Sequence, residues 1–162
     1  LGEVVVGRRP AECLASAPAL GRRWWAAAGG GAWTQTRLNG VDGDPRRLQV
    51  SAVSALADAS FSYSDRVGWE QRTSTGFDEL VGQAWRTRGY GDFYSHLLVA
   101  EGAVDIAAEP ELNPWDVAAL IPIITEAGGS ITGYDGSPAL TAGGAFTTNG
   151  LLHEVTAKLL QG

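Results

Sequence analysis

Short apolar and polar segments alternate along the first half of the chain in the manner of β-strands. Strand-forming runs occupy residues 3–6, 15–17, 22–28, 32–38, 48–50 and 59–63. Gly29-Gly30-Gly31 predicts a bend, and Asn39-Gly40 predicts a hairpin turn because both residue types tolerate a positive φ. We therefore expect residues 1–75 to be rich in strands.

The second half changes to a helical rhythm interrupted by short apolar strands. Apolar residues from Phe77 to Trp85 recur at helical spacing. Further helices are predicted at residues 93–101, 113–127 and 151–160, with strands at 88–90, 104–108, 130–134 and 145–148. Gly128-Gly129 should end the middle helix, and Pro122 should bend it because proline has no backbone donor. Residues 76–162 thus alternate helix and strand, which predicts a mixed α/β class with a layered sheet.

Composition narrows the function classes. The 162 residues carry 12 Lys and Arg against 18 Asp and Glu, a formal net charge of −6. Nucleic-acid binding relies on clustered basic residues, so we expect no nucleic-acid partner. No apolar run approaches the ~20 residues of a membrane-spanning helix, and no secretory signal pattern opens the chain. With Cys13 as the single cysteine, the prediction is a cytoplasmic protein without membrane association.

The chain contains no methionine and begins at Leu1. A translation product normally starts with methionine, so we expect this sequence to be part of a longer one.

Asp116 is the most informative acidic residue. It lies in the first turn of a predicted helix that begins Asn113-Pro114, where a carboxylate commonly caps the helix. The same carboxylate could ligate a hard cation such as Mg²⁺ at the end of the sheet. The residues alone leave both interpretations open.

Two further acidic residues, Glu109 and Glu111, follow the apolar run Ile106-Ala107-Ala108. Carboxylates that leave the end of a strand are well placed to face a ligand. A solvated loop is the alternative for both, and the favoured one for Glu111.

The segment Arg88-Gly89-Tyr90-Gly91-Asp92 joins a predicted strand to a helix. Its Gly-x-Gly lacks the third glycine of a dinucleotide fingerprint, because Tyr94 takes that place. Asp92 is either the N-cap of the helix or a partner for a substrate amine. Arg88 is either a surface charge or a phosphate contact.

A longer set of motifs resembles the inositol monophosphatase family, which are Mg²⁺-dependent phosphomonoesterases of layered α/β fold. The motifs are Trp115-Asp116-Val117-Ala118-Ala119, Thr125-Glu126-Ala127-Gly128-Gly129, and Arg88-Gly89-Tyr90-Gly91-Asp92 followed by Val99-Ala100-Glu101-Gly102 and Asp105. The resemblance runs from about Ser16 to the end. Residues 19–26 and 72–77 are most similar to bacterial members that hydrolyse histidinol phosphate.

The resemblance implies a role for each matching residue. Asp116 would ligate a metal, Glu109 would bind the alcohol portion of the substrate, and Asp92 would lie near the same pocket and suit a substrate with an ammonium and an imidazole. Arg88 and Gly91 are weaker candidates for substrate contact. In this family Mg²⁺ activates a water and neutralises the phosphate during in-line attack.

Two metal-binding motifs of the family are missing from this sequence. Leu1-Gly2-Glu3 does not match the Gly-Glu-Glu stretch, and Asp44-Pro45-Arg46 does not match the Asp-Pro-Ile/Leu-Asp-Gly-Thr loop. We therefore assign no catalytic residue and interpret residues 1–162 as the C-terminal part of one phosphatase-like domain, incomplete at its N-terminus. The fold expected is the layered α/β fold of the family.

The activity expected is hydrolysis of a small phosphorylated alcohol, histidinol phosphate first, with this chain alone inactive. An inositol-1-phosphate phosphatase and a catalytically dead binding or scaffold module of the same fold are the alternatives. A second copy of the chain, or a chain that supplies the missing part, is the expected protein partner. Some apolar core surface should then be uncovered here, or covered by another chain.

Overall fold

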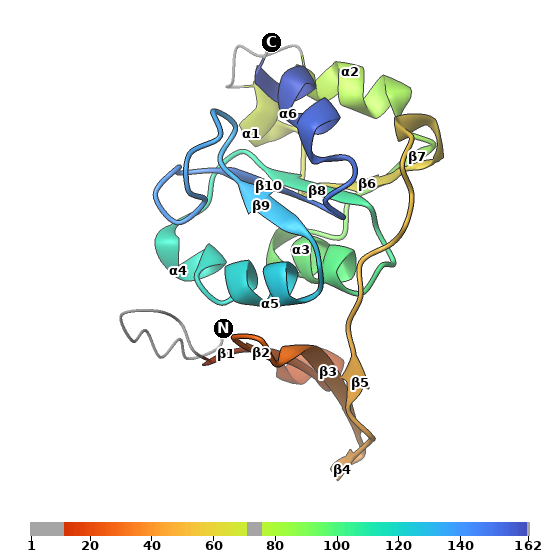
Figure 1. Cartoon of the computed structure of the whole chain (residues 1–162), viewed down its shortest axis with the longest axis vertical. Coiled ribbons are helices and arrows are strands. Elements are labelled where there is room, and N and C mark those ends of the chain that lie inside the picture. The colour runs from red at the N-terminus through yellow and green to blue at the C-terminus, as the bar shows by residue number, and fades with distance from the viewer. Residues whose placement is uncertain (1–11, 71–75, 162) are drawn as a thin grey trace.

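The computed structural model describes residues 12–70 and 76–161 and contains two β-sheets separated by helices (Figure 1). The first sheet consists of β1 (Glu12–Ala17), β2 (Arg22–Ala27), β3 (Gly31–Leu38), β4 (Val41–Asp42) and β5 (Arg46–Arg47). Its strands are antiparallel in the order β1-β2-β3-β4, and β5 pairs with β3. The predicted strand at residues 3–6 lies outside the described residues.

The second sheet consists of β6 (Ser60–Ser62), β7 (Arg86–Arg88), β8 (Ile106–Glu109), β9 (Ser130–Thr132) and β10 (Ala145–Thr148). Its order is β7-β6-β8-β10-β9. β6 pairs in parallel with both β7 and β8, whereas β10 runs antiparallel to β8 and β9. The described residues thus form one antiparallel sheet and one mixed sheet, and together with the helices these confirm the predicted mixed α/β class.

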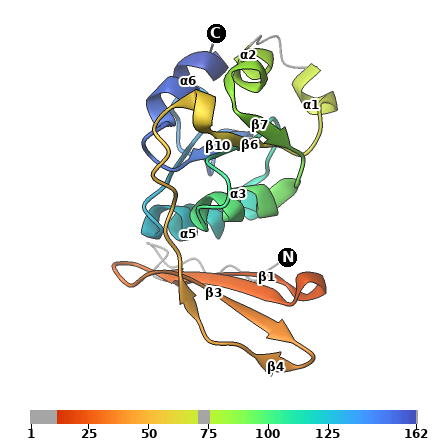
Figure 2. The same ribbon diagram turned by 90° about the vertical axis from the view of Figure 1, so that its right-hand side faces the viewer.

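Helices cover both faces of the second sheet. They are α1 (Val67–Glu70), α2 (Gly76–Gln83), α3 (Asp92–Ala100), α4 (Pro114–Val117), α5 (Leu120–Glu126) and α6 (His153–Gln161), with short 3₁₀ turns at Pro18–Leu20 and Leu56–Asp58. Figure 2 shows α3 and α5 between the two sheets, with α2 and α6 on the opposite face of the second sheet. The layers are therefore sheet, helix, sheet and helix.

Each helix layer is held by its own apolar core. Trp24 from the first sheet packs with Leu97 of α3 and Ile123 of α5, all fully buried. On the other side of the second sheet, Phe61 and Leu80 form a cluster with buried aromatic residues that include Phe77 of α2 and Phe146 of β10. Because β8 is covered on both faces, its whole length is buried, and this explains its continuous apolar run.

The hairpin predicted at Asn39-Gly40 is confirmed. Asn39 and Gly40 have φ values of 51° and 80°, and they connect Leu38 to Val41 in register. This positive φ at both central residues is what a primed two-residue turn requires.

Three predicted elements differ from the structure. Residues 48–50 form no strand, because the chain leaves the first sheet here and its N–H groups bond to different elements. Leu48 N–H donates to Ala32 O (2.8 Å), and Val50 N–H donates to Ala127 O (3.1 Å). The strand predicted at 88–90 lies at Arg86–Arg88.

The predicted helix 113–127 is divided into α4 and α5 at residues 118–119, not merely bent. The break precedes Pro122 because a proline ring clashes with the carbonyl four residues earlier, which here belongs to Ala118.

Large apolar side chains are exposed at several places on the described surface. They include Leu14, Leu38, Trp85, Trp115 and Leu151. Leu14 is paired with Trp25, and Trp25 with Trp33, so these three form a row across β1, β2 and β3. Single exposed apolar side chains are normal on protein surfaces, so the expectation of uncovered core surface stays a prediction. No helix in residues 12–70 and 76–161 has the length and apolar character needed to span a membrane.

Candidate functional site

The parallel part of the second sheet brings the ends of three strands together. β7, β6 and β8 are neighbours with the same direction, so their carboxyl ends lie at one edge. Asp92 follows β7, Ser64 and Asp65 follow β6, and Glu109 is the last residue of β8. Ligands of open α/β sheets bind at such an edge. A cavity of about 300 Å³ lies here, and these four residues are part of its lining.

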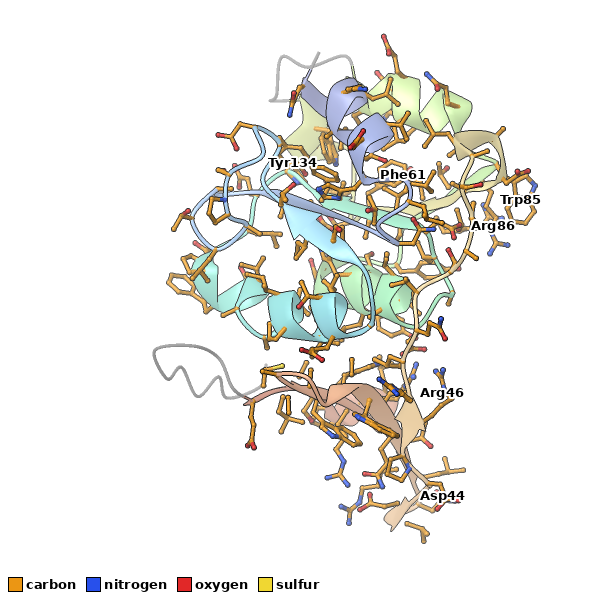
Figure 3. The ribbon with its side chains drawn as sticks, in the orientation of Figure 1. Asp44, Arg46, Phe61, Trp85, Arg86 and Tyr134 are labelled. Atoms are coloured by element: carbon orange, nitrogen blue, oxygen red, sulfur yellow. The ribbon has the colours of Figure 1, made fainter. Side chains whose placement is uncertain are left out.

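Glu109 is the buried member of this group. Its side chain is only 3% exposed, and the prediction that it lies on a loop is wrong because it still belongs to β8. The hydroxyl of Ser64 donates to Glu109 Oε2, whereas Oε1 has no hydrogen-bond partner in the described structure. Its backbone carbonyl accepts the hydroxyl of Tyr134 at 2.7 Å. Figure 3 shows Tyr134 beside the second sheet, close to the helices that cover it.

Burial raises the pKa of Glu109 to about 7. The hydrogen bond from Ser64 favours the ionised form and opposes this shift, and the negative charges of Asp92 and Asp65 add to it. A carboxyl group that titrates near neutrality and lacks one hydrogen-bond partner can accept a donor from a ligand. Glu109 is therefore the strongest binding candidate in the described structure.

Asp92 begins α3 in an unusual conformation. Its φ is 47°, directly after Gly91 with φ 84°, and its side chain makes no capping hydrogen bond to the helix. The N-cap interpretation of Asp92 is thus wrong: Gly91 occupies the N-cap position, and the exposed Asp92 carboxylate is left to line the cavity.

Ser64 and Asp65 are site residues that the sequence motifs do not indicate. Asp65 Oδ1 accepts the backbone N–H groups of Val67 (2.7 Å) and Gly68 (3.4 Å), which fixes the carboxylate at the start of α1. Their position directly after the strand-forming run at 59–63 could have indicated a site at the end of a strand. That inference also requires knowing that β6 lies beside β8, which the sequence does not show.

Arg88 and Gly91 do not form part of the cavity lining. The guanidinium of Arg88 is exposed and donates to the adjacent Thr87 carbonyl at 2.7 Å. Gly91 lets the chain turn from β7 into α3, and its carbonyl accepts the N–H of Ser95 at 3.3 Å. Their substrate-binding roles stay predictions.

Asp116 makes the capping contact that its position predicts. Its Oδ2 accepts the N–H of Asn113 at 2.9 Å, and the side chain is partly exposed. This contact occupies one oxygen and leaves a metal-binding role for Asp116 as a prediction.

The described residues do not by themselves complete a metal centre. Within residues 12–70 and 76–161, no three His, Cys, Asp or Glu side chains are grouped so that they could hold a metal ion. Asp116 alone cannot fill the six or more oxygen positions around a hard cation. No catalytic step through a metal can therefore be assigned to these residues.

In open α/β sheets, small ligands usually bind where parallel strands end together at a cavity, so this edge is the candidate binding site. A sequence model of the inositol monophosphatase family matches residues 4–162, so the chain belongs to this family. The match starts earlier than Ser16, where the sequence motifs begin.

Three relatives place the chain within this family. It is 52% identical to the histidinol-phosphatase of Streptomyces coelicolor over 91% of this chain and 54% of that protein. It is 50% identical to the histidinol-phosphatase of Mycobacterium tuberculosis over 94% of this chain and 58% of that protein. The Thermotoga maritima IMPase structure superposes with a TM-score of 0.76 at 28% identity, covering 93% of this chain and 55% of that one. The chain thus spans about half the length of the curated relatives it matches.

Proposed function

We propose that this chain supplies the alcohol-binding side of a phosphomonoesterase site, and that its substrate is histidinol phosphate. The observation that carries the proposal is the partly unsatisfied carboxyl group of Glu109 in a cavity lined by further carboxylates. Histidinol carries an ammonium group, which is a positively charged hydrogen-bond donor, and an imidazole, which donates through its ring N–H and becomes positively charged when it is protonated. Two relatives at about 50% identity bear the name histidinol-phosphatase, and this supports the same substrate.

The roles of the chain's own residues follow from their positions. Glu109 would bind the alcohol portion of the substrate, with Ser64 holding its other oxygen in place. Asp92 would face the cationic groups. A phosphate dianion would be repelled by these carboxylates, so we place the phosphate outside this cavity.

The family is metal-dependent. We propose Mg²⁺ as the metal and Asp116 as one of its ligands, with the other ligands supplied from outside the described residues. Either a missing N-terminal part of the same domain or another chain, a second copy included, would supply them. We therefore expect little or no turnover from this chain alone, and robust phosphate release by it would refute that expectation.

A chimeric enzyme tests the proposed substrate. The part of the Streptomyces coelicolor histidinol-phosphatase that this chain does not match is joined to this chain, and phosphate release with Mg²⁺ is measured. We expect a higher kcat/KM for histidinol phosphate than for inositol 1-phosphate, and we expect Asp92→Ala to reduce that preference.

The alternatives have their own outcomes in this assay. A preference for inositol 1-phosphate would replace the proposed substrate with the family's other one. A chimera that folds, as shown by circular dichroism, and hydrolyses neither compound would instead identify a catalytically dead binding module. A cytoplasmic location stays a prediction.

A further inference from the structure

The cavity at the ends of β7, β6 and β8 has an unusually one-sided charge. Asp65, Asp92, Glu109 and Glu111 all contribute to its lining, and none of the described residues that line it is a Lys, Arg or His. Acidic residues alone do not define a site, because carboxylates also gather on ordinary solvated surfaces.

Glu109 distinguishes this cavity from an ordinary acidic surface. It is 97% buried, as its 3% exposure shows, and its Oε1 has no donor among the described residues. A buried acceptor without a partner carries a free-energy cost, because it has lost its hydrogen bonds to water. A ligand that carries N–H donors into this cavity would recover that cost.

Two backbone hydrogen bonds hold the carboxylate of Asp65 in a defined orientation. The N–H groups of Val67 and Gly68 hold its Oδ1, so its second oxygen is oriented before any ligand arrives. Its charge acts on Glu109 across the cavity. The residue follows a different strand from Asp92, so the two approach a ligand from different strand ends.

We propose that Asp65 is a specificity-determining residue that, together with Asp92 and Glu109, selects a substrate whose alcohol portion carries cationic N–H groups over a neutral polyol. A neutral polyol would leave the three carboxylates without compensating charge, whereas an ammonium and a protonated imidazole provide it. The inference rests on the proposed function only in assigning this cavity to the alcohol portion of the substrate.

The experiment measures binding of L-histidinol, histamine and myo-inositol to the chain by calorimetry or NMR. Asp65→Asn keeps the oxygen that accepts the Val67 N–H and removes the charge. We expect it to weaken binding of L-histidinol and histamine about 2- to 5-fold, the range for an exposed charge pair, and to leave myo-inositol unchanged. Asp65→Glu, which restores the charge, should recover part of the loss.

Asp135→Asn is the matched control. Asp135 is also exposed and also accepts the N–H two residues on, from Ser137 at 2.9 Å, but it lies outside the cavity lining. Unchanged affinity for both cations in Asp65→Asn, or an equal loss in Asp135→Asn, would overturn the assignment.

The result is separable from the test of the proposed function. If histamine binding depends on Asp65 while the chimera does not hydrolyse histidinol phosphate, the cation selectivity stands and the substrate is wrong. If the chimera hydrolyses histidinol phosphate while Asp65→Asn binds both cations normally, the substrate stands and the role of Asp65 is overturned.

Discussion

Glu109, the proposed binding group, lies at the end of a strand. Its backbone belongs to β8 and its carbonyl accepts the Tyr134 hydroxyl, while its side chain is buried and accepts the hydroxyl of Ser64. The carboxyl group is therefore kept in an environment that favours its neutral form. This is typical of a binding group and unfavourable for stability.

The pH dependence of stability follows from this burial. The pKa of Glu109 is about 7 in the folded chain and lower when unfolded, so between these values the folded state holds one more proton. The free energy of unfolding should therefore fall as pH rises through this window. Because Glu109→Gln cannot ionise, its stability relative to the wild type should increase by about 1–3 kcal/mol between pH 5 and pH 8. Urea unfolding at both pH values measures this, and a difference independent of pH would contradict it.

Sequence reasoning proposed some candidate residues and missed others for a physical reason. Asp116 and Glu109 lie in local motifs, a helix start and a strand end, that a linear pattern can reveal. Ser64 and Asp65 join the cavity lining only because β6 pairs with β8 at a separation of 45 positions, as the partners Phe61 and Ile106 show. The hydrophobic pattern of a short stretch of sequence does not indicate which distant strand it pairs with.

At the scale of elements, the α2–α6 contact depends on a glycine. A methyl group added at Gly76 would overlap the backbone carbonyl of Leu159, which cannot move without shifting α6. We expect Gly76→Ala to destabilise the chain by about 1–3 kcal/mol in urea unfolding. Gly82 on the same helix is exposed with open space around it, so Gly82→Ala should be neutral or stabilising by up to about 1 kcal/mol. Equal effects of the two substitutions would argue against this packing.

A buried ion pair at the end of α3 joins the first sheet to the helix layer beside it. Glu101 Oε1 accepts Arg22 Nη2 and Trp24 Nε1, each at 2.6 Å, and its side chain is 8% exposed. Glu101→Gln places an amide against these donors, and we expect a loss of about 1–3 kcal/mol in the free energy of unfolding.

An exposed ion pair supplies the control for this substitution. Arg66 and Asp78 are 2.6 Å apart with side chains that are 51% and 69% exposed. Asp78→Asn should therefore cost less than about 1 kcal/mol. If Asp78→Asn cost as much as Glu101→Gln, burial would not explain the contribution of Glu101.

The boundaries of elements were the least predictable feature at this scale. The absence of a strand at residues 48–50 reflects neighbours distant in sequence. The break between α4 and α5 comes from the nearby Pro122, which the sequence predicted to bend the helix and not to divide it. By contrast, the hairpin at Asn39-Gly40 depends on two adjacent residues, and the sequence predicted it correctly.

In the molecule as a whole, the two sheets have different roles. The mixed sheet carries Glu109, Asp92 and Asp65 at one edge, while the first sheet packs against α3 and α5 from the other side. Figure 3 shows Asp44, from the mismatched Asp44-Pro45-Arg46 segment, at the far end of the first sheet from this mixed sheet. The described residues thus form an acidic cavity at the strand ends, which we propose binds the alcohol portion of the substrate. Among them, no three His, Cys, Asp or Glu side chains are grouped so that they could hold a metal ion.

An NMR titration of the isolated chain with L-histidinol, in the absence of any metal ion, tests most directly whether the strand-end cavity binds the alcohol. We expect saturable shifts of backbone signals at the three strand ends, around Ser64–Asp65, Asp92 and Glu109, with weaker binding in Glu109→Gln. The absence of shifts in a folded chain, or shifts centred elsewhere, would contradict it.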